Sequence, residues 1–499
     1  MHPLLPHITD HLTDIFGSLG YFIPEVYLGL LFLVVMITDV LFGKKSTSLC
    51  RTVACAGLLV VLFKDLQQVG ITLNAQHFIF SNMLLLSPAA VWFKLVIDLL
   101  AFILLLYFTW DKKLASHKKG LSDLYTITIA SIFGLHLMVM AVNLLSIYLA
   151  IEMVSIASYL MVAYRSENAF STEAGLKYVL FGAASSAIML YGISLLYGFG
   201  GSLDIVLQST VTELLKVNPL SSFFAILLIL VGIGFKLSFV PVHFWVPDVY
   251  QGAPTPVTAY LSTLPKIAAF ALLVNFLPPF ILLGKGTGFD LGILLSVAGI
   301  ISMIAGNFAA VMQSNVKRML AYSSIGHTGF ALMAVVTFNQ QGLSALTYYL
   351  LVYALANIGA LVLATYFSNV ADAEDMDGYK GLGLKYPVAA VCFTIIMISL
   401  TGLPVSAGFT GKVFVFSAVY GIYQQTHSIW LMLLMATGAL TTVVSLFYYI
   451  KIPLNLFLKR AENQDIVYVK SYNSVILAVI ISFALILLGV FPDFVLKYL

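Results

Sequence analysis

The sequence predicts an all-α polytopic membrane protein, on the evidence of its composition and of the length of its apolar runs. Of its 499 residues, 61% are hydrophobic and only 9% are charged, and the mean hydropathy is +1.00. An average soluble domain is about 25% charged, so this composition excludes a set of soluble domains. It also excludes a disordered chain, and the net charge of +3 gives no general attraction to nucleic acid.

The apolar runs have the length of membrane-spanning helices, which need about 20 residues to cross the hydrocarbon. They are too long and too uniform for the alternating strands of a β-barrel. The fourth and fifth runs are continuous, with Asn143 as the expected turn between them. We expect fourteen spans, at about residues 21–42, 48–66, 84–110, 121–142, 143–164, 174–200, 221–245, 256–278, 290–312, 318–338, 342–368, 386–423, 428–450 and 472–491.

The connections between these spans are too short for a soluble domain. The most polar are 111–120, 201–220, 372–385 and 451–471. The third holds an acidic group that we expect to be solvated rather than to bind a cation, made of Asp372, Glu374, Asp375 and Asp377.

Few side chains suit a metal or a cofactor. Cys50, Cys55 and Cys392 form no C-x-x-C motif and are expected to be small apolar fillers. His7 and His11 are four residues apart, but no cysteine or carboxylate set accompanies them, so a polar N-terminal tail is expected there. That tail lacks the basic region of a signal peptide. No phosphate-binding glycine motif occurs in a βαβ context.

The basic residues of the loops predict the orientation. With fourteen spans, alternate loops share a side, and the positive-inside rule puts the richer side in the cytoplasm and both termini outside. The richer side has Lys44, Lys45, Arg51, Lys112, Lys113, Lys118, Lys119, Arg165, Lys317, Arg318, Lys380, Lys385, Lys451, Lys459, Arg460 and Lys470, and the poorer side has Lys64, Lys216, Lys285 and Lys497.

Five lysines and Glu152 fall within predicted spans, where a charge at the helix centre costs about 2.5–3.5 kcal/mol. Such residues usually mark ion or proton pathways. For Lys94, snorkelling near the outer end of its span or a simple ion pair with Asp98, which follows at i, i+4, is favoured. Glu152 and Lys177 lie on neighbouring spans and can form a pair, either static or with a proton affinity that changes with its separation. The lysines are Lys94, Lys177, Lys236, Lys266 and Lys412.

Two spans are interrupted next to a lysine. Pro241 follows Lys236, and a run with Pro404 and three glycines precedes Lys412. Proline removes a backbone donor, which lipid tolerates only where neighbours or water satisfy the freed groups. Two interrupted spans, far apart in the chain, predict two related halves around a hydrated site at the midplane.

Other titratable groups extend this pattern. Lys266 follows Pro265 in mid-span, where a helix distortion would admit water. His327 lies between the regions of Lys266 and Lys412 in chain order, and a functional role and a simple hydrogen-bonded core histidine are about equally favoured. For His136 the core role is favoured. His243 follows the first interruption, either on a proton entry path or capping the break.

Three segments resemble the antiporter-like membrane subunits of respiratory complex I, the proton-pumping NADH:quinone oxidoreductase. They are GFKLSFVPVHFWVPDVYQGAPTPVTAYLSTLPKIAAF (234–270), KRMLAYSSIGHTGF (317–330) and GLP…GFTGK (402–412), and the resemblance extends over the whole chain. It is greatest to the N-type subunits. Lys412 stands where M-type subunits carry Glu, and no room is left for the lateral helix of L-type subunits.

The resemblance implies two inverted five-helix repeats with broken helices 7 and 12. The expected divisions are 1–120 (helices 1–3), 121–280 (helices 4–8), 281–455 (helices 9–13) and 456–499 (helix 14). It implies a hydrated proton relay in which Glu152 adjusts the proton affinity of Lys236, directly or through Lys177. Lys236 and Lys266 would hold and pass the proton, His327 would link the halves, and Lys412 would lead to the exit.

The resemblance also implies a place in the bacterial inner membrane. M-type and K-type subunits would be the neighbours on its two sides, and the lipid bilayer would be in contact with the rest of its surface. NADH, FMN, iron–sulfur clusters and quinone would belong to the rest of the complex, so we expect neither a cofactor nor a redox site in this chain. Two alternatives are a subunit of a multisubunit Na⁺/H⁺ antiporter and a ferredoxin-driven relative of complex I. A pure scaffold is disfavoured, because each buried lysine costs insertion energy.

Overall fold

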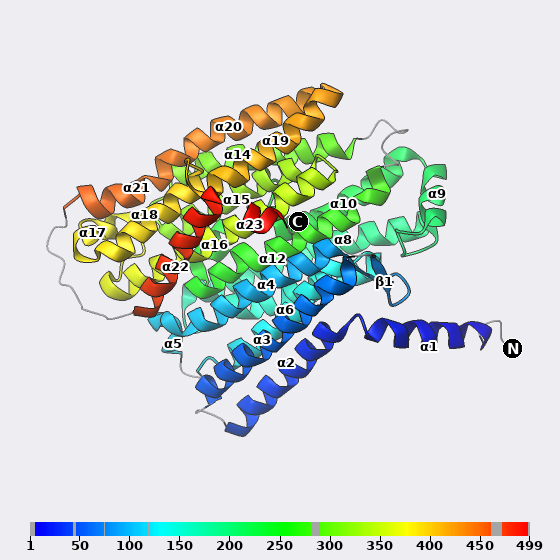
Figure 1. Cartoon of the computed structure of the whole chain (residues 1–499), viewed down its shortest axis with the longest axis horizontal. Helices are drawn as coiled ribbons and strands as arrows, with labels where there is room; N and C mark the ends of the chain where they lie inside the picture. Colours follow the sequence, from blue (N-terminus) through cyan, green and yellow to red (C-terminus); the bar gives the residue numbers. More distant parts are fainter. Residues whose placement is uncertain are drawn as a thin grey trace.

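The computed structural model describes residues 5–42, 46–73, 75–117, 120–281, 290–460 and 472–497, with side chains from residue 12 onward. Long helices run side by side along one direction (Figure 1). Among the described residues, twelve helices are long and apolar enough to cross a membrane, which confirms an all-α polytopic membrane protein. They contain α2 (Ile23–Phe42), α3 (Ser46–Thr72), α4 (Pro88–Tyr107), α6 (Ser122–Met140), α7 (Leu144–Val162), α8 (Ala169–Gly200), α10 (Pro219–Leu237), α12 (Thr255–Phe276), α14 (Leu291–Val311), α16 (Gln340–Ala371), α20 (Ile429–Tyr449) and α22 (Tyr472–Val490).

Three further helices lie where the sequence predicts the remaining spans. α15 (Val316–Val335) is less apolar because it carries basic residues, hydroxyls and a histidine. α18 (Pro387–Thr401) and α19 (Ala407–Thr426) divide the predicted span 386–423 between them. The exact count of fourteen spans and the two inverted repeats stay predictions.

Both predicted helix interruptions are confirmed. α10 ends where Ser238 takes a left-handed conformation (φ +65°), and α11 (Val246–Gly252) begins beyond an irregular segment that contains Pro241. α18 ends at Gly402 (φ +83°), and α19 begins after Pro404. A helix end leaves carbonyl groups without partners inside the helix, so both interruptions create hydrogen-bond acceptors within the bundle.

The core of the bundle is formed by α12 and α16, which lie near its middle in Figure 1. In each, 94% of the most apolar 18-residue window is buried, against 22% in α2. α16 packs against α12, α15, α18, α19 and α22. Polar side chains that project from α12 and α15 therefore meet other protein groups and not lipid.

The bundle has two distinct ends (Figure 1). The α5 end carries α5 (Lys112–Ala115), α17 (Leu382–Lys385) and α21 (Lys451–Pro453). The hairpin end carries α9 (Gln208–Lys216) and the antiparallel strands β1 (His77–Ile79) and β2 (Leu84–Leu86), with His77 opposite Leu86. Short turns complete the described chain at η2 (Phe108–Trp110), η3 (Met376–Tyr379), η4 (Leu454–Leu458) and α23 (Asp493–Leu496).

The expected polar N-terminal tail is wrong, because residues 5–19 form α1 (Leu5–Leu19), which projects away from the bundle in Figure 1. Its apolar residues recur at spacings of three and four, the period of an amphipathic helix, between acidic and histidine residues. The side chains of His7 and His11 lie outside the described part. The turn at Asn143 is confirmed, since its side chain caps α7 by accepting from the Leu145 N–H at 2.9 Å.

Some of the loop charges used to predict the orientation cannot be placed in the structure. They lie outside the described residues and are Lys44, Lys45, Lys118, Lys119, Lys285 and Lys470.

Candidate functional site

Lys236 stands at the last turn of α10, directly before the interruption. Its side chain is 3% exposed, and its ammonium has no hydrogen-bond partner among the described groups. The Nζ atom lies 5.8, 5.6 and 6.0 Å from the ring centroids of Tyr159, Tyr178 and Phe235. Aromatic faces and the C-terminal end of a helix both attract a cation. The ammonium is thus attracted by its surroundings but not fixed by a contacting carboxylate.

Lys266, on α12, is connected to the interruption through α15. Its ammonium donates to the hydroxyls of Ser324 at 2.7 Å and Thr328 at 3.1 Å. The Thr328 hydroxyl also lies 2.8 Å from the carbonyl oxygen of Leu237, to which it donates. Thr328 therefore links Lys266 to a carbonyl at the end of α10, one residue from Lys236.

His327, also on α15, lies among tyrosine hydroxyls. Its Nδ1 is 2.7 Å from the Tyr349 hydroxyl, and its Nε2 is 3.1 Å from the Tyr449 hydroxyl. Neutral imidazole has one donor and one acceptor nitrogen, so two hydroxyls can satisfy the ring in either tautomer. The charged groups that act electrostatically on His327 are Lys412 and Lys266. On α15, His327 lies close in sequence to Ser324 and Thr328, which contact Lys266, and to Phe330, which contacts Lys412.

Lys412 lies beyond the second interruption, on α19, and reaches back to it. Its ammonium donates to the Thr401 carbonyl oxygen, at the end of α18, at 2.7 Å and to the Thr442 hydroxyl at 3.4 Å. It also stands 4.7 Å from the ring centroid of Phe330. Lys236 and Lys412 therefore both meet the C-terminal end of an interrupted helix, one from its own helix and one from the next.

The structure does not bring Glu152 and Lys177 together. Glu152 is half-buried and accepts a hydrogen bond from the Ser186 hydroxyl. Lys177 is 37% exposed and forms ion pairs with Glu173 at 2.8 Å and Asp248 at 2.7 Å. Because Lys177 pairs with Glu173 and Asp248 and not with Glu152, these contacts favour the direct route from Glu152 to Lys236 over the route through Lys177.

His243 and the two prolines lie in the interruptions as predicted. His243 is half-buried between α10 and α11, and its Nδ1 has no hydrogen-bond partner among the described groups. Pro241 and Pro404 are exposed on this chain. The two predicted roles of His243 stay open.

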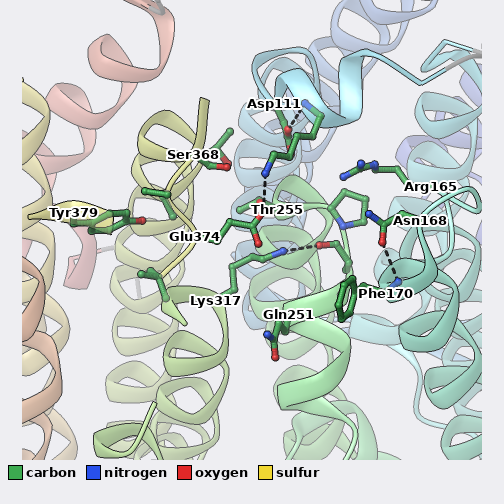
Figure 2. Close-up of a pocket in the computed structure, with 18 residues that line it drawn as sticks. Asp111, Arg165, Asn168, Phe170, Gln251, Thr255, Lys317, Ser368, Glu374 and Tyr379 are labelled. Carbon is green, nitrogen blue, oxygen red and sulfur yellow. Dashed lines mark hydrogen bonds and ion pairs between the residues drawn. The ribbon is translucent and has the colours of Figure 1, made fainter. Parts of the chain in front are cut away.

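A cavity of about 330 Å³ opens at the α5 end and is lined by acidic and basic side chains (Figure 2). It brings together Lys113, Arg165 and Lys317, from loops that the charge bias assigns to one side. Glu374 pairs with Lys113 at 2.8 Å. Burial raises the pKa of Glu374, but the hydrogen bond from Lys113 and the charge of Lys317 outweigh it and hold that pKa below 4.5. Five charged side chains thus line the cavity, three basic (Lys113, Arg165, Lys317) and two acidic (Asp111, Glu374).

A second group of buried charges, the N-terminal cluster, was not predicted. Both expected roles of Lys94 are wrong, because its side chain is fully buried and its partner is not Asp98. Lys94 Nζ instead lies 2.7 Å from Glu25 and 2.7 Å from Asp65, on α2 and α3. Asp98 pairs with His136 at 3.0 Å. The N-terminal cluster consists of Glu25, Asp65, Lys94, Asp98 and His136.

Sequence reasoning also missed the hydroxyl groups that connect the lysines. Thr328, Ser324 and the tyrosines are ordinary residues in membrane spans, and their spacing carries no distinct signal. For the N-terminal cluster there was a signal: Glu25 and Asp65 are carboxylates inside the first two predicted spans. A charge in a span has a partner as a rule, and the two acids should have been matched with Lys94.

The fold and the site define a multi-pass membrane protein whose interior holds a row of titratable side chains. The family model of the NADH:quinone oxidoreductase/Mrp antiporter transmembrane proteins matches residues 141–442. NADH-quinone oxidoreductase subunit N 2 of Chloroherpeton thalassium is 40% identical over 89% of this chain and 86% of its own. Subunit N of Chlorobium chlorochromatii is 38% identical over the same shares. The chain belongs to this family of antiporter-like membrane subunits.

Solved structures support the same assignment. A chain of respiratory complex I from Thermus thermophilus is 29% identical, with a TM-score of 0.77 over 95% of this chain and 98% of its own. A chain of the archaeal membrane-bound sulfane sulfur reductase is 22% identical, with a TM-score of 0.80 over 95% and 96%. The second likeness shows the fold alone.

Proposed function

We propose that this chain is a proton-translocating N-type subunit of a membrane-bound NADH–quinone oxidoreductase. The observation that carries the proposal is the set of contacts made by Lys236, Lys266 and Lys412. Each ammonium is buried, and its described contacts are hydroxyls, carbonyls or aromatic rings and no carboxylate. Burial disfavours the charged form of a lysine unless an opposite charge is close. Such lysines can release and regain a proton, as a relay requires.

The proton route follows the polar groups between the two interruptions. A proton on Lys236 passes to Lys266 along the side of α15 that carries Thr328, and from there past His327 to Lys412. Water fills the steps that have no direct hydrogen bond. Glu152 raises or lowers the proton affinity of Lys236 through its charge, according to its own protonation.

Lys177 acts away from the centre of this route, near its α5 end. Its ion pair with Asp248 connects α8 to α11, whereas its ion pair with Glu173 lies within α8, and Asp248 also pairs with Arg318 at 2.7 Å. The role of Lys177 is to position α11 beside the start of α15. The two repeats, 121–280 and 281–455, each supply one interrupted helix to the route.

The subunit works inside a complex and not alone. Its neighbours are the M-type and K-type subunits in the bacterial inner membrane, with both of its termini on the outer side. NADH, FMN, iron–sulfur clusters and quinone are bound by other subunits, and no cofactor is bound here. The relatives named as NADH-quinone oxidoreductase subunit N and the complex I match support membership of such a complex.

The test replaces Lys236 or Lys266 by Ala in the assembled complex, reconstituted in proteoliposomes. We expect proton pumping per unit time to fall at least about tenfold, because a missing relay group breaks the route. NADH oxidation falls with it where the two are tightly coupled. The matched control is Lys216→Ala, since Lys216 is 65% exposed on α9 and pairs only with Glu213 among the described groups.

Unchanged pumping by assembled Lys236→Ala and Lys266→Ala complexes would contradict the relay. Exchange of Na⁺ for H⁺ by the purified chain alone in liposomes would instead support a self-standing antiporter.

A further inference from the structure

The N-terminal cluster lies outside the route of the proposed function and has features of a site of its own. Its five side chains are fully buried, each with an exposed fraction of 0%. Four helices meet there, because the five residues come from α2, α3, α4 and α6. Burying these charged groups among four helices costs free energy, so their presence there requires an explanation.

The charges of the cluster do not balance. It holds three carboxyl groups, one amine and one imidazole. With Lys94 and His136 both protonated, one negative charge remains in excess. An ionised carboxylate without compensation is unfavourable in a dry interior, and close carboxylates oppose each other's ionisation. A third proton makes the cluster neutral.

The contacts indicate which carboxyl group carries that third proton. Glu25 Oε1 accepts from Lys94 at 2.7 Å and lies 3.2 Å from His136 Nδ1. Asp98 Oδ1 lies 3.0 Å from His136 Nε2. Asp65 Oδ1 is close to Lys94, but neither of its oxygens has an aligned hydrogen bond among the described groups. Hydrogen bonds stabilise the ionised forms of Glu25 and Asp98 more, so protonation of Asp65 costs least.

No other described charge compensates the cluster. α3 packs against α2, α4 and α6, and the groups of these helices that face Asp65 are the cluster members themselves. Asp39 and Asp123 are about 20 Å further along α2 and α6 by helical rise. On α3 itself, Arg51 donates to Thr109, and Lys64 donates to Gln67.

The N-terminal cluster lies near the hairpin end of the bundle. Glu25 is the third residue of α2 and Lys94 the seventh of α4, within about 10 Å of their ends. Gln68 joins the cluster to this end, because its Oε1 accepts from Lys94 at 2.6 Å and its Nε2 donates to the Tyr21 carbonyl at 2.7 Å. The Tyr21 ring stacks on His77 at 4.4 Å, and both are partly exposed.

The same geometry disfavours a metal ion. Ligand atoms of Glu25, Asp65 and His136 all lie within 4.8 Å of one another, as in a cation site. However, the Lys94 ammonium contacts both carboxylates at 2.7 Å and supplies the positive charge that an ion would bring. A metal ion would have to displace or neutralise it.

We propose that the N-terminal cluster is a proton-binding site that exchanges one proton with water at the hairpin end, with Asp65 as the residue that carries it. The proposal is independent of the relay through Lys236 and Lys266. Loss of pumping in those lysine variants would not test the role of Asp65. The infrared result for Asp65 would likewise not test the lysine relay.

The test is infrared difference spectroscopy of the purified, assembled complex between two pH values. The wild type is expected to show the C=O stretching band of a protonated buried carboxyl group that disappears as the pH rises. Asp65→Asn should remove this band, whereas Asp65→Glu should shift it. If the Asp65→Asn complex fails to assemble, the shift in Asp65→Glu still identifies the residue. The matched control, Glu213→Gln, changes an exposed glutamate on α9 and should leave the band in place.

Access is tested by transfer to D₂O. His77→Ala removes the ring stacked over Tyr21 and should speed the deuterium shift of the band several-fold, while Phe78→Ala, an exposed neighbour on β1, should not. A band that persists in both Asp65 variants, its absence from the wild type, or its loss on adding Na⁺ or Mg²⁺ at constant pH would each overturn the proposal. Equal rates in His77→Ala and wild type would overturn the path.

Discussion

The three lysines of the proposed proton route, Lys236, Lys266 and Lys412, were predictable from the sequence because a charge is rare in a membrane span. Their partners were not. Thr328 and Ser324 are common in spans, and only the packing of α15 against α12 brings their hydroxyls to the Lys266 ammonium. For Lys177 the predicted partner was the wrong one. The sequence suggested Glu152 on the preceding span, but in the structure Lys177 donates to Asp248, 71 residues away.

The connection between Lys236 on α10 and Lys266 on α12 can be tested at Thr328. Thr328→Val keeps the shape but removes the hydroxyl between Lys266 and the Leu237 carbonyl. A hydrogen bond to a charged group contributes about 1.5–3 kcal/mol, so we expect proton pumping to fall about tenfold. Pumping by the reconstituted complex is measured against Thr394→Val, whose hydroxyl donates, within the described part of the chain, only to the Ala390 carbonyl in α18. Equal rates in both variants would refute a role for the hydroxyl.

At the scale of elements, the interruptions were predictable because proline and glycine have few other uses inside a span. α1 and the β-hairpin were not. A short amphipathic helix rich in histidine and acid has the composition of a tail, and strands of three residues are too short for a recognisable alternation. The N-terminal cluster was missed for the related reason that its residues come from four helices.

The second interruption depends on a close approach of α19 to α18. An added Cβ at Gly408 would overlap the Ser399 carbonyl oxygen, while at Gly421, on the same helix, it would meet only the end of Gln341 at 3.8 Å. Gly408→Ala should therefore destabilise the subunit by about 1–3 kcal/mol and weaken the contact of Lys412 with Thr401. Thermal unfolding of the complex is the measurement, and Gly421→Ala is the control. Equal unfolding temperatures would show that the approach is not strained.

At the scale of the whole molecule, charge is arranged in two ways. Most loop charges lie in water, and their bias between the two ends predicts the orientation. The buried charges include a central row of lysines without contacting carboxylates and an N-terminal cluster with an excess of carboxylates. The first arrangement suits groups that pass protons on, and the second suits a group that binds one further proton, because excess negative charge favours protonation.

The orientation itself can be tested with single cysteines on the two ends. Ser116 is exposed beside α5, and Thr212 is exposed on α9. In a background with Cys55→Ala, the two remaining native cysteines, Cys50 and Cys392, are buried. If the α5 end faces the cytoplasm, a membrane-impermeant maleimide should label Thr212→Cys in intact cells but Ser116→Cys only after permeabilisation. The opposite pattern would invert the orientation, and labelling of both in intact cells would refute the assignment of the two ends to opposite sides.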